Sequence, residues 1–227
     1  MLDQEAKNSV DLNSGDYSSV TLYTHPSCPH NHRIRFVITE KEVMHKKVYV
    51  GNPRRPPEEL LAVNPAGVIP TLVDRHLVIN HVDVIECYLD ERFPYPPLLP
   101  IEPHDRARMR MMIRHVEKEW YKRIDIMNKS RSRATVKKAH KELEEDILVH
   151  ADLFKRRWFF SDHEFLLLDC VIAPVLWRLF SLGIRLGDKA ASQPVRRYMK
   201  RLFLRKGFRY SLSEEEADMH ANSECYL

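Results

Sequence analysis

The 227-residue sequence contains few glycines, few cysteines and no long apolar run. Six glycines in a chain that is 44% hydrophobic exclude a flexible array and indicate a globular protein long enough to bury a core. No apolar stretch reaches the roughly 18 residues that a membrane-spanning helix needs, and residues 1–19 contain no apolar segment typical of a signal peptide. We therefore expect a cytoplasmic protein that makes no contact with a membrane.

The cysteines and histidines show no pattern typical of a metal site. His25, His30 and His32 lie close together, but they have no acidic or second-site partner at ligand spacing. The cysteines are scattered, which fits a reducing compartment better than a disulfide framework; they are Cys28, Cys87, Cys170 and Cys225. We expect no metal, and the sequence indicates no cofactor.

The net charge of +4 is unevenly distributed along the chain. Residues 185–209 contain nine basic side chains and one acidic one, and residues 105–123 contain seven basic and three acidic ones. Such faces either contact phosphate or an acidic protein, or they are ordinary solvated helix faces. Because the sequence contains no recognisable motif for reading a DNA groove, we expect any contact with DNA to be indirect.

Hydrophobic periodicity divides the chain into two halves of different class. Within residues 20–93, strand and helix patterns alternate in the order β-α-β-α-β-β-α, which is typical of a thioredoxin-like domain. The expected strands cover 20–23, 46–50, 70–73 and 77–79, and the expected helices cover 30–41, 57–63 and 82–89. Residues 1–19 offer too little apolar surface to offset the entropy of ordering, so we expect them to be disordered.

Residues 94–103 contain five prolines and are predicted to link the two halves. Residues 104–212 show only helical periodicity, and the nearly apolar segment 168–182 is predicted to be the buried central helix of this half. Residues 213–227 contain no lysine or arginine and are expected to form an acidic tail. The predicted fold class is therefore α/β followed by all-α.

Cys28 is the most distinct enzymatic candidate, at the start of a Cys-Pro-x-x-x-Arg segment that ends at Arg33. A thiol between a strand and a helix faces unpaired backbone NH groups, which lower a thiol's pKa and favour the thiolate. His30 and His32 are close enough in sequence to assist. No second cysteine follows three residues later, so only a monothiol reaction is supported. The alternative is a partly buried, unreactive cysteine in a turn.

The segment 94–97, with the sequence Pro-Tyr-Pro-Pro, is the second candidate site. Prolines hold a loop extended before binding, so less ordering entropy opposes association, and an aromatic side chain between them is a good contact group. The alternative is a rigid linker between domains. Further upstream, a cis bond between Ile69 and Pro70 would leave the Ile69 backbone free to pair with the backbone of a ligand.

Two sequence patterns carry a family resemblance. Asn-Pro-x-Gly-x-x-Pro-x-Leu-x-Asp spans residues 64–74, and Tyr-Leu-Asp-Glu-Arg-Phe-Pro spans residues 88–94. Together they resemble the thioredoxin-like half of the glutathione-transferase fold. Within that fold, the chain most resembles the stringent starvation protein A family, the RNA-polymerase-associated regulators of bacteria, and the similarity extends over residues 20–212.

The resemblance implies a vestigial glutathione-type site. The equivalent of Pro70 is a cis-proline in the family, and Cys28 corresponds to the nucleophile of glutaredoxins and of thiol-type glutathione transferases. Glutathione-binding members carry Glu-Ser where this chain has His81 and Val82, which supply neither the carboxylate nor the hydroxyl that holds the γ-glutamyl group. Asp83 could compensate only through a change of register. The vestigial site comprises Cys28, Ile69, Pro70, His81 and Val82.

The resemblance also implies that the Pro-rich segment contacts RNA polymerase. In the family, a matching Pro-His-Pro-Pro segment lies on a surface pocket that is needed for transcription activation. Tyr95 replaces that histidine here, and tyrosine does not titrate near neutral pH. The implied polymerase-binding residues are Pro94, Tyr95, Pro96, Pro97 and Leu98.

These observations lead to one hypothesis and two alternatives. The hypothesis is a non-enzymatic transcription regulator of the bacterial stress response that binds RNA polymerase holoenzyme, including its sigma factor. The resemblance further implies a homodimer, or a heterodimer with a related subunit. The first alternative is a glutathione-dependent monothiol transferase or reductase that uses Cys28. The second is a scaffold that needs a related subunit to complete its binding surface.

Overall fold

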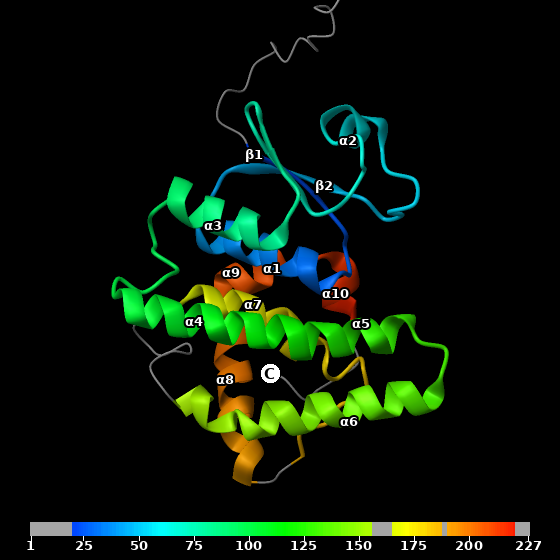
Figure 1. The fold of residues 1–227 in the computed structure, drawn as a ribbon, viewed down its shortest axis with the longest axis vertical. Helices are drawn as coiled ribbons and strands as arrows, with labels where there is room; N and C mark the ends of the chain where they lie inside the picture. The colour runs from blue at the N-terminus through cyan, green and yellow to red at the C-terminus, as the bar shows by residue number, and fades with distance from the viewer. Residues whose placement is uncertain (1–19, 156–164, 188–189, 221–227) are drawn as a thin grey trace, which may run out of the picture.

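The structure is a computed structural model that describes residues 20–155, 165–187 and 190–220 (Figure 1). The predicted disordered segment 1–19 lies outside the described residues, as do residues 221–227 of the predicted acidic tail, including Cys225. None of the helices in the described ranges is long and apolar enough to cross a membrane.

The N-terminal half contains a four-stranded sheet with the order β2-β1-β3-β4. β1 pairs in parallel with β2 and antiparallel with β3, and β3 pairs antiparallel with β4. The register places Leu22 of β1 beside Leu72 of β3, and both side chains are fully buried. The strands are β1 (Val20–Thr24), β2 (His45–Tyr49), β3 (Thr71–Asp74) and β4 (Leu77–Ile79).

Helices lie on both faces of this sheet (Figure 1). α1 (Pro29–Glu40) and α3 (Val82–Arg92) lie between the sheet and the C-terminal half, and α2 (Glu58–Val63) lies on the other side. Leu60 of α2 packs with Tyr23 and Val50 in a small apolar cluster. The predicted element order β-α-β-α-β-β-α is confirmed.

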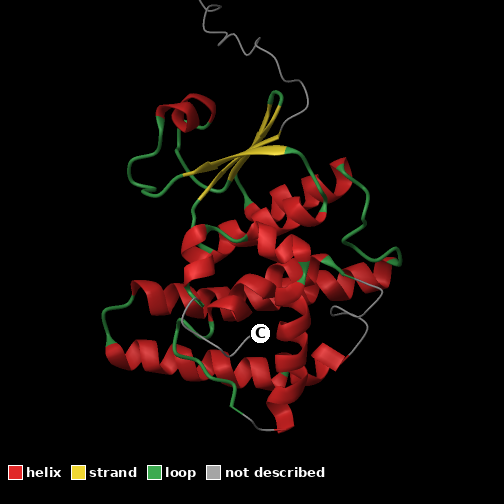
Figure 2. Ribbon diagram, turned by 180° about the vertical axis from the view of Figure 1, so that it is seen from behind, coloured by secondary structure: helices red, strands yellow, loops and turns green. Residues whose placement is uncertain are grey.

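The described part of the C-terminal half is helical (Figure 2). Its α-helices are α4 (Pro103–His115), α5 (Lys122–Lys129), α6 (Arg133–Val149), α7 (Leu167–Arg178), α8 (Gln193–Leu204), α9 (Lys206–Ser211) and α10 (Glu214–Asp218). A π-helical turn, η1 (Val116–Tyr121), joins α4 to α5, and two 3-10 turns are η2 (Ala151–Lys155) and η3 (Ala190–Ser192). Every residue of α7 is buried, which confirms a central helix within the predicted segment 168–182, although the helix ends at Arg178 and turns follow it.

One hydrophobic core joins the two halves of the molecule. α1 packs against α7 and α9. Phe36 of α1 and Trp177 of α7 both contact Phe208 of α9, with ring centroids 5.3 and 5.2 Å apart. Burying one large apolar side chain contributes about 1.5–3 kcal/mol, so these shared contacts couple the stability of the two halves.

The acidic C-terminal segment differs from the expected tail. Glu216 of α10 is fully buried, and its carboxylate accepts hydrogen bonds from Arg35 of α1 and Arg178 of α7. Ser213 caps α10, because its hydroxyl accepts a hydrogen bond from the Glu216 NH at 3.1 Å. Local composition indicates a solvated acidic segment. The two buried arginines, which are distant in sequence, need an anionic partner and draw this carboxylate into the interior.

Candidate functional site

The first candidate site surrounds the N-terminus of α1. Cys28 is the N-cap residue of α1 and is half-buried, and Pro29 begins the helix. The Cys28 carbonyl accepts hydrogen bonds from the backbone NH groups of Asn31 at 3.1 Å and His32 at 2.9 Å. The residue therefore lies at the positive end of the helix dipole, as the local sequence predicts.

The two histidines predicted to assist Cys28 have other partners. The His30 ring packs against Tyr121, with ring centroids 4.5 Å apart, and burial lowers the pKa of His30. His32 is fully buried, with Nε2 2.9 Å from Ser211 Oγ and Nδ1 3.2 Å from Arg178 Nη1. Burial and the neighbouring Arg178 hold the pKa of His32 well below its usual range. Both ring nitrogens of His32 thus contact the C-terminal half.

The arginine of the Cys-Pro-x-x-x-Arg segment is a buried structural group. Arg33 is 1% exposed, and its guanidinium donates to both carboxylate oxygens of Glu86 in α3. It also donates to Glu117 Oε1 in η1 at 2.9 Å. Bidentate pairs of this kind are strong and directional. Arg33 therefore ties α1, α3 and η1 together.

The strand side of this site contains the Ile69–Pro70 peptide bond, which is cis, as the resemblance implies. Pro70 is buried and Ile69 is half-buried. The preceding turn requires Gly67, which has φ +61°; a Cβ there would lie 2.8 Å from Pro56 Cγ.

The N-terminus of α3 completes the site. His81 is its N-cap residue, is exposed and makes no side-chain capping hydrogen bond, and Val82 is the first helical residue. Asp83, in the first turn, is also exposed. An imidazole and an isopropyl group therefore occupy the positions at which the family resemblance implies a carboxylate and a hydroxyl in glutathione-binding members.

Strand pairing brings Cys28, the Ile69–Pro70 peptide and the start of α3 to one edge of the sheet. Tyr23 near the end of β1 pairs with Thr71 at the start of β3, so Cys28 follows the strand beside Pro70. Leu72 pairs with Ile79, the last residue of β4, so the start of α3 lies at the same edge. The sequence-predicted residues of the vestigial site thus share one edge of the molecule.

The second candidate site is the Pro-rich loop that follows α3. Tyr95 is 83% exposed, whereas Leu98 is only 1% exposed. The Tyr95–Pro96 peptide bond is cis. The Leu98 carbonyl accepts a hydrogen bond from the NH of Leu167 at 2.7 Å, which fixes the end of the loop to the start of α7. The tyrosine ring is therefore exposed to solvent, while the end of the loop is fixed to the rest of the molecule.

An ion pair between a buried lysine and a partly buried aspartate fixes the backbone of the loop. Lys41 is 4% exposed; its ammonium donates to the carbonyls of Phe93 at 2.8 Å and Pro96 at 2.6 Å and forms an ion pair with Asp90. Asp90 Oδ1 in turn accepts a hydrogen bond from the Leu98 NH at 2.9 Å. The sequence analysis missed both residues. Asp90 falls within the family pattern at residues 88–94, but nothing local indicates the role of Lys41.

A groove of about 880 Å³ lies beside the loop, with Pro96 in its wall. The end of α1, the start of β2 and α9 form the rest of the lining. Within it, Arg205 Nε and Nη2 lie 2.8 and 2.7 Å from the carboxylate oxygens of Glu40. Tyr210 is 65% exposed and Lys206 is exposed. The loop and the groove together form a mixed aromatic and charged surface.

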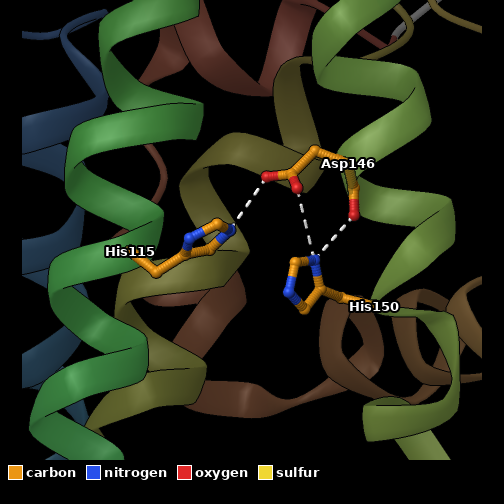
Figure 3. A group of neighbouring side chains, drawn as sticks. All are labelled: His115, Asp146 and His150. Atoms are coloured by element: carbon orange, nitrogen blue, oxygen red, sulfur yellow. Dashed lines mark hydrogen bonds and ion pairs between the residues drawn. The ribbon is translucent and has the colours of Figure 1, made fainter.

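A third group of side chains could hold a metal ion. It consists of His115, Asp146 and His150 and lies in the helical half (Figure 3). The sequence analysis did not identify it. The spacing of Asp146 and His150, four residues apart on one helix, was the available local signal, but only the fold brings His115 beside them.

Known proteins resemble this chain in sequence and in fold. The family described as "Glutathione S-transferase, N-terminal domain" matches residues 27–92. A stringent starvation protein A homolog of Haemophilus ducreyi is 37% identical over 201 residues, which cover 88% of this chain and 93% of that protein. A homolog of the same name from Coxiella burnetii is 38% identical over 205 residues, which cover 89% and 95%.

The fold likeness extends to solved structures. Glutathione transferase Omega 3C from Trametes versicolor matches with a TM-score of 0.75 at 22% identity, covering 88% of this chain and 91% of that one. This match, with the element order above, confirms the predicted fold class: a glutathione-transferase-like protein with a thioredoxin-like N-terminal half and a helical C-terminal half.

Proposed function

Because the chain belongs to the stringent starvation protein A family, we propose that it regulates bacterial transcription by docking on RNA polymerase holoenzyme. The docking surface is the exposed part of the loop, residues 94–97, with the adjoining groove; Leu98, which the resemblance also implied as a contact residue, is buried and anchors the loop. The observation that carries this proposal is the position of Tyr95, which is 83% exposed on a loop whose backbone is held by buried groups.

The fixed loop favours association for an entropic reason. A partner that binds a flexible segment must offset the cost of ordering it, whereas a loop already held in one shape loses little freedom. Lys41 and Asp90 hold the loop backbone through three hydrogen bonds to Phe93, Pro96 and Leu98. An exposed tyrosine on such a support is a typical contact residue at a protein interface.

The groove indicates the chemistry of the polymerase or sigma segment that would bind. Lys206 and Tyr210 of α9 are exposed in its lining, as is Glu42 after α1, and Arg209 is exposed beside Tyr210, outside the groove. Two cations beside an aromatic ring suit an acidic segment that carries apolar or aromatic side chains. DNA enters this proposal only indirectly, as the template that the polymerase holds.

The proposal includes no glutathione transferase activity. The edge of the sheet that would bind glutathione offers His81 and Val82 in place of an anionic acceptor and a hydroxyl. The alternative function is a glutathione-dependent monothiol transferase or reductase. It is favoured by one observation, the position of Cys28 at the N-cap of α1.

We further propose that the chain works as a dimer, either with a second copy or with a related subunit. Apolar side chains are exposed on both halves, among them Val84 of α3 at 48% and Met111 of α4 at 74%. Native mass spectrometry of the purified chain and of the complex from bacterial extract would distinguish a homodimer, a heterodimer and a monomer.

Co-elution with RNA polymerase holoenzyme on size exclusion at moderate salt tests the docking proposal. We expect the wild-type chain to co-elute and the Pro94→Ala/Tyr95→Ala variant to do so much less, while both keep the same unfolding transition. Ile101→Ala is the matched control, because Ile101 is an exposed apolar residue, 85% exposed, outside the loop. A well-folded wild-type chain that never co-elutes would contradict the proposal.

A parallel enzyme assay distinguishes the monothiol enzyme from the non-enzymatic regulator. Turnover of a disulfide substrate with glutathione, lost in Cys28→Ala, would favour the monothiol enzyme. We expect no such turnover from the wild-type chain.

A further inference from the structure

Three potential metal ligands from two helices converge in the helical half (Figure 3). His115 is the last residue of α4, Asp146 lies in the last turn of α6, and His150 is the C-cap residue of α6. A ring nitrogen of each histidine and a carboxylate oxygen of Asp146 lie within 4.8 Å of one another. Their side chains are 32%, 20% and 24% exposed, so an ion and water can reach them.

The hydrogen bonding of His150 leaves one of its nitrogens available to a metal. His150 Nδ1 faces Asp146 and lies 2.8 Å from its backbone carbonyl oxygen and 3.4 Å from its carboxylate Oδ1 (Figure 3). Because a carbonyl oxygen only accepts, Nδ1 carries the proton and Nε2 keeps its lone pair. Metal-bound histidines typically show this arrangement, in which a backbone carbonyl fixes the second ring nitrogen.

A buried donor orients Asp146. Trp120 is 1% exposed, and its Nε1 donates to Asp146 Oδ2 at 2.7 Å. His115 Nε2 lies 2.9 Å from the same oxygen. A carboxylate offers about four lone-pair sites on its two oxygens, so Asp146 can accept from Trp120 and still bind a cation.

The backbone that supplies Trp120 is unusual. Trp120 belongs to η1, the π-helical turn that begins directly after His115. Turns of this type are rare and frequently mark functional sites. Here the turn follows one ligand and carries the residue that orients another.

We propose that His115, Asp146 and His150 bind one Zn²⁺ ion, with water completing its coordination. Two imidazoles and a carboxylate are ligands that Zn²⁺ prefers, and three protein ligands with one open position form a common zinc arrangement. Tetrahedral bonds of about 2.0–2.1 Å place ligand atoms roughly 3.3 Å apart. The three ligands close on the ion by side-chain rotation, in which His150 Nε2 turns toward the Asp146 carboxylate and His115 exchanges its hydrogen bond to Asp146 for a bond to the metal.

The site is separate from both candidate sites described above. α6 lies at the end of the molecule away from the sheet, whereas Cys28 belongs to the half that contains the sheet and the Pro-rich loop joins α3 of that half to α4 (Figure 1). The bound ion joins the end of α4 to the end of α6. Because the three ligands meet only in the folded chain, Zn²⁺ stabilises the folded state by mass action.

Competition with a chromophoric zinc chelator tests this proposal on the full chain, prepared without a polyhistidine tag. We expect one site in the wild-type chain. His115→Ala and His150→Gln each weaken the affinity by at least about tenfold, since loss of an outer-shell partner alone costs about 10–100-fold. Asp146→Asn, which keeps an acceptor for Trp120 but removes the charge, has the same effect.

His104→Ala is the matched control. His104 is an exposed histidine of the same helix, 3.1 Å from the carboxylate of Asp105, but it does not belong to the three-residue cluster. We expect this variant to keep the wild-type affinity. At a hundredfold excess over Kd, Zn²⁺ should raise the unfolding midpoint of the wild-type chain and of this variant by about 5 °C or more, and leave the ligand variants unchanged.

Three results would overturn the proposal. The first is an affinity of the wild-type chain for Zn²⁺ that is weaker than that of free histidine. The second is an equal Zn²⁺ affinity in the wild-type chain and the ligand variants. The third is a loss of Zn²⁺ affinity in His104→Ala as large as in the ligand variants. In any of these cases the cluster is a hydrogen-bond network that joins two helices. If the ligand variants fail to fold, Co²⁺ bound to the wild-type chain decides the matter, because a tetrahedral site with nitrogen ligands gives intense visible absorption and an octahedral aqua ion does not.

Discussion

The two ends of α1 use buried charge for opposite purposes. In its N-terminal half, up to its middle, Arg33 and Arg35 are paired with Glu86 and Glu216 in the interior. At the C-terminal end, Lys41 is equally buried, but its hydrogen bonds hold the backbone of an exposed loop. Arg33 and Arg35 tie α1 to distant elements of the chain, whereas Lys41 supports an exposed surface. The comparison teaches that a buried cation at the C-terminal end of α1 fixes the loop on which the proposed docking function depends.

The largest loss of stability is expected from removing the carboxylate that Arg35 and Arg178 share in the interior. Glu216→Ala leaves Arg35 and Arg178 without their shared anionic partner, and removing one member of a buried pair costs about 3–5 kcal/mol. We expect a loss of that size in the free energy of unfolding by urea. Glu215→Ala, at an exposed position of the same helix, should change it by less than about 0.5 kcal/mol. Similar free energies of unfolding for the two variants would show that Glu216 and its two arginines do not stabilise the fold.

Lys41→Met should affect the other end of α1. It removes the donor to Phe93 and Pro96 and leaves Asp90, which is 13% exposed, without its cation. We expect a loss of about 2–3 kcal/mol in stability and weaker co-elution with RNA polymerase, although Tyr95 is unchanged. Lys46→Met is the control, since the Lys46–Glu59 pair is exposed and 3.8 Å long. If Lys41→Met associated fully with the polymerase, docking would not depend on the fixed shape of the loop.

A smaller effect concerns pH and His32. Burial, then Arg178, holds the pKa of His32 in the folded chain well below its ordinary value. In the unfolded chain the ring takes up a proton as the pH falls through about 6.5, so the unfolded state binds more protons there. Stability is therefore full above that pH and falls below it, by up to about 1.4 kcal/mol per pH unit for this one group.

The variant His32→Asn isolates this contribution. Burial also lowers the pKa of His30, His45 and His220, so the wild-type slope contains several groups. We expect the unfolding free energy of His32→Asn to fall less steeply between pH 6.5 and 5 than that of the wild-type chain. Parallel slopes would mean that His32 is protonated in the folded chain.

The smallest effect is expected from Cys28→Ala. Cys28 is half-buried and makes its helix-starting hydrogen bonds through its carbonyl, which alanine retains. Stability should change by less than about 1 kcal/mol, and co-elution with polymerase should be unchanged. If this variant lost polymerase association as fully as Pro94→Ala/Tyr95→Ala, the functional contrast between the two ends of α1 would fail.

Local signals were sufficient for most of the fold. Period-2 and helical patterns predicted the element order of residues 20–93, and the apolar run near residue 170 predicted the buried α7. The helix expected over residues 30–41 is α1, which begins one residue earlier, at Pro29. The tail prediction failed at Glu216 because acidic composition indicates exposure only where no buried cation lies within reach.

The candidate sites could be predicted only in part. Pro94–Leu98 and Cys28 carry their signals in adjacent residues, so the sequence analysis found them. Lys41 is 49 residues from Asp90 in the sequence, and neither residue indicates the other. His115 similarly meets Asp146 only because α5, which continues α4 and η1, packs against α6.

The sequence by itself determined which segments are helices and strands, which faces are buried and which family the chain resembles. These properties depend on residues a few positions apart, whose side chains share a face of one element. The tertiary structure alone decided the partners of the buried charges: Glu86 for Arg33, Glu216 for Arg35 and Arg178, and Asp90 for Lys41. A buried charge must be neutralised by whichever group the packing brings within hydrogen-bond distance, and that group is set by the three-dimensional arrangement of distant elements.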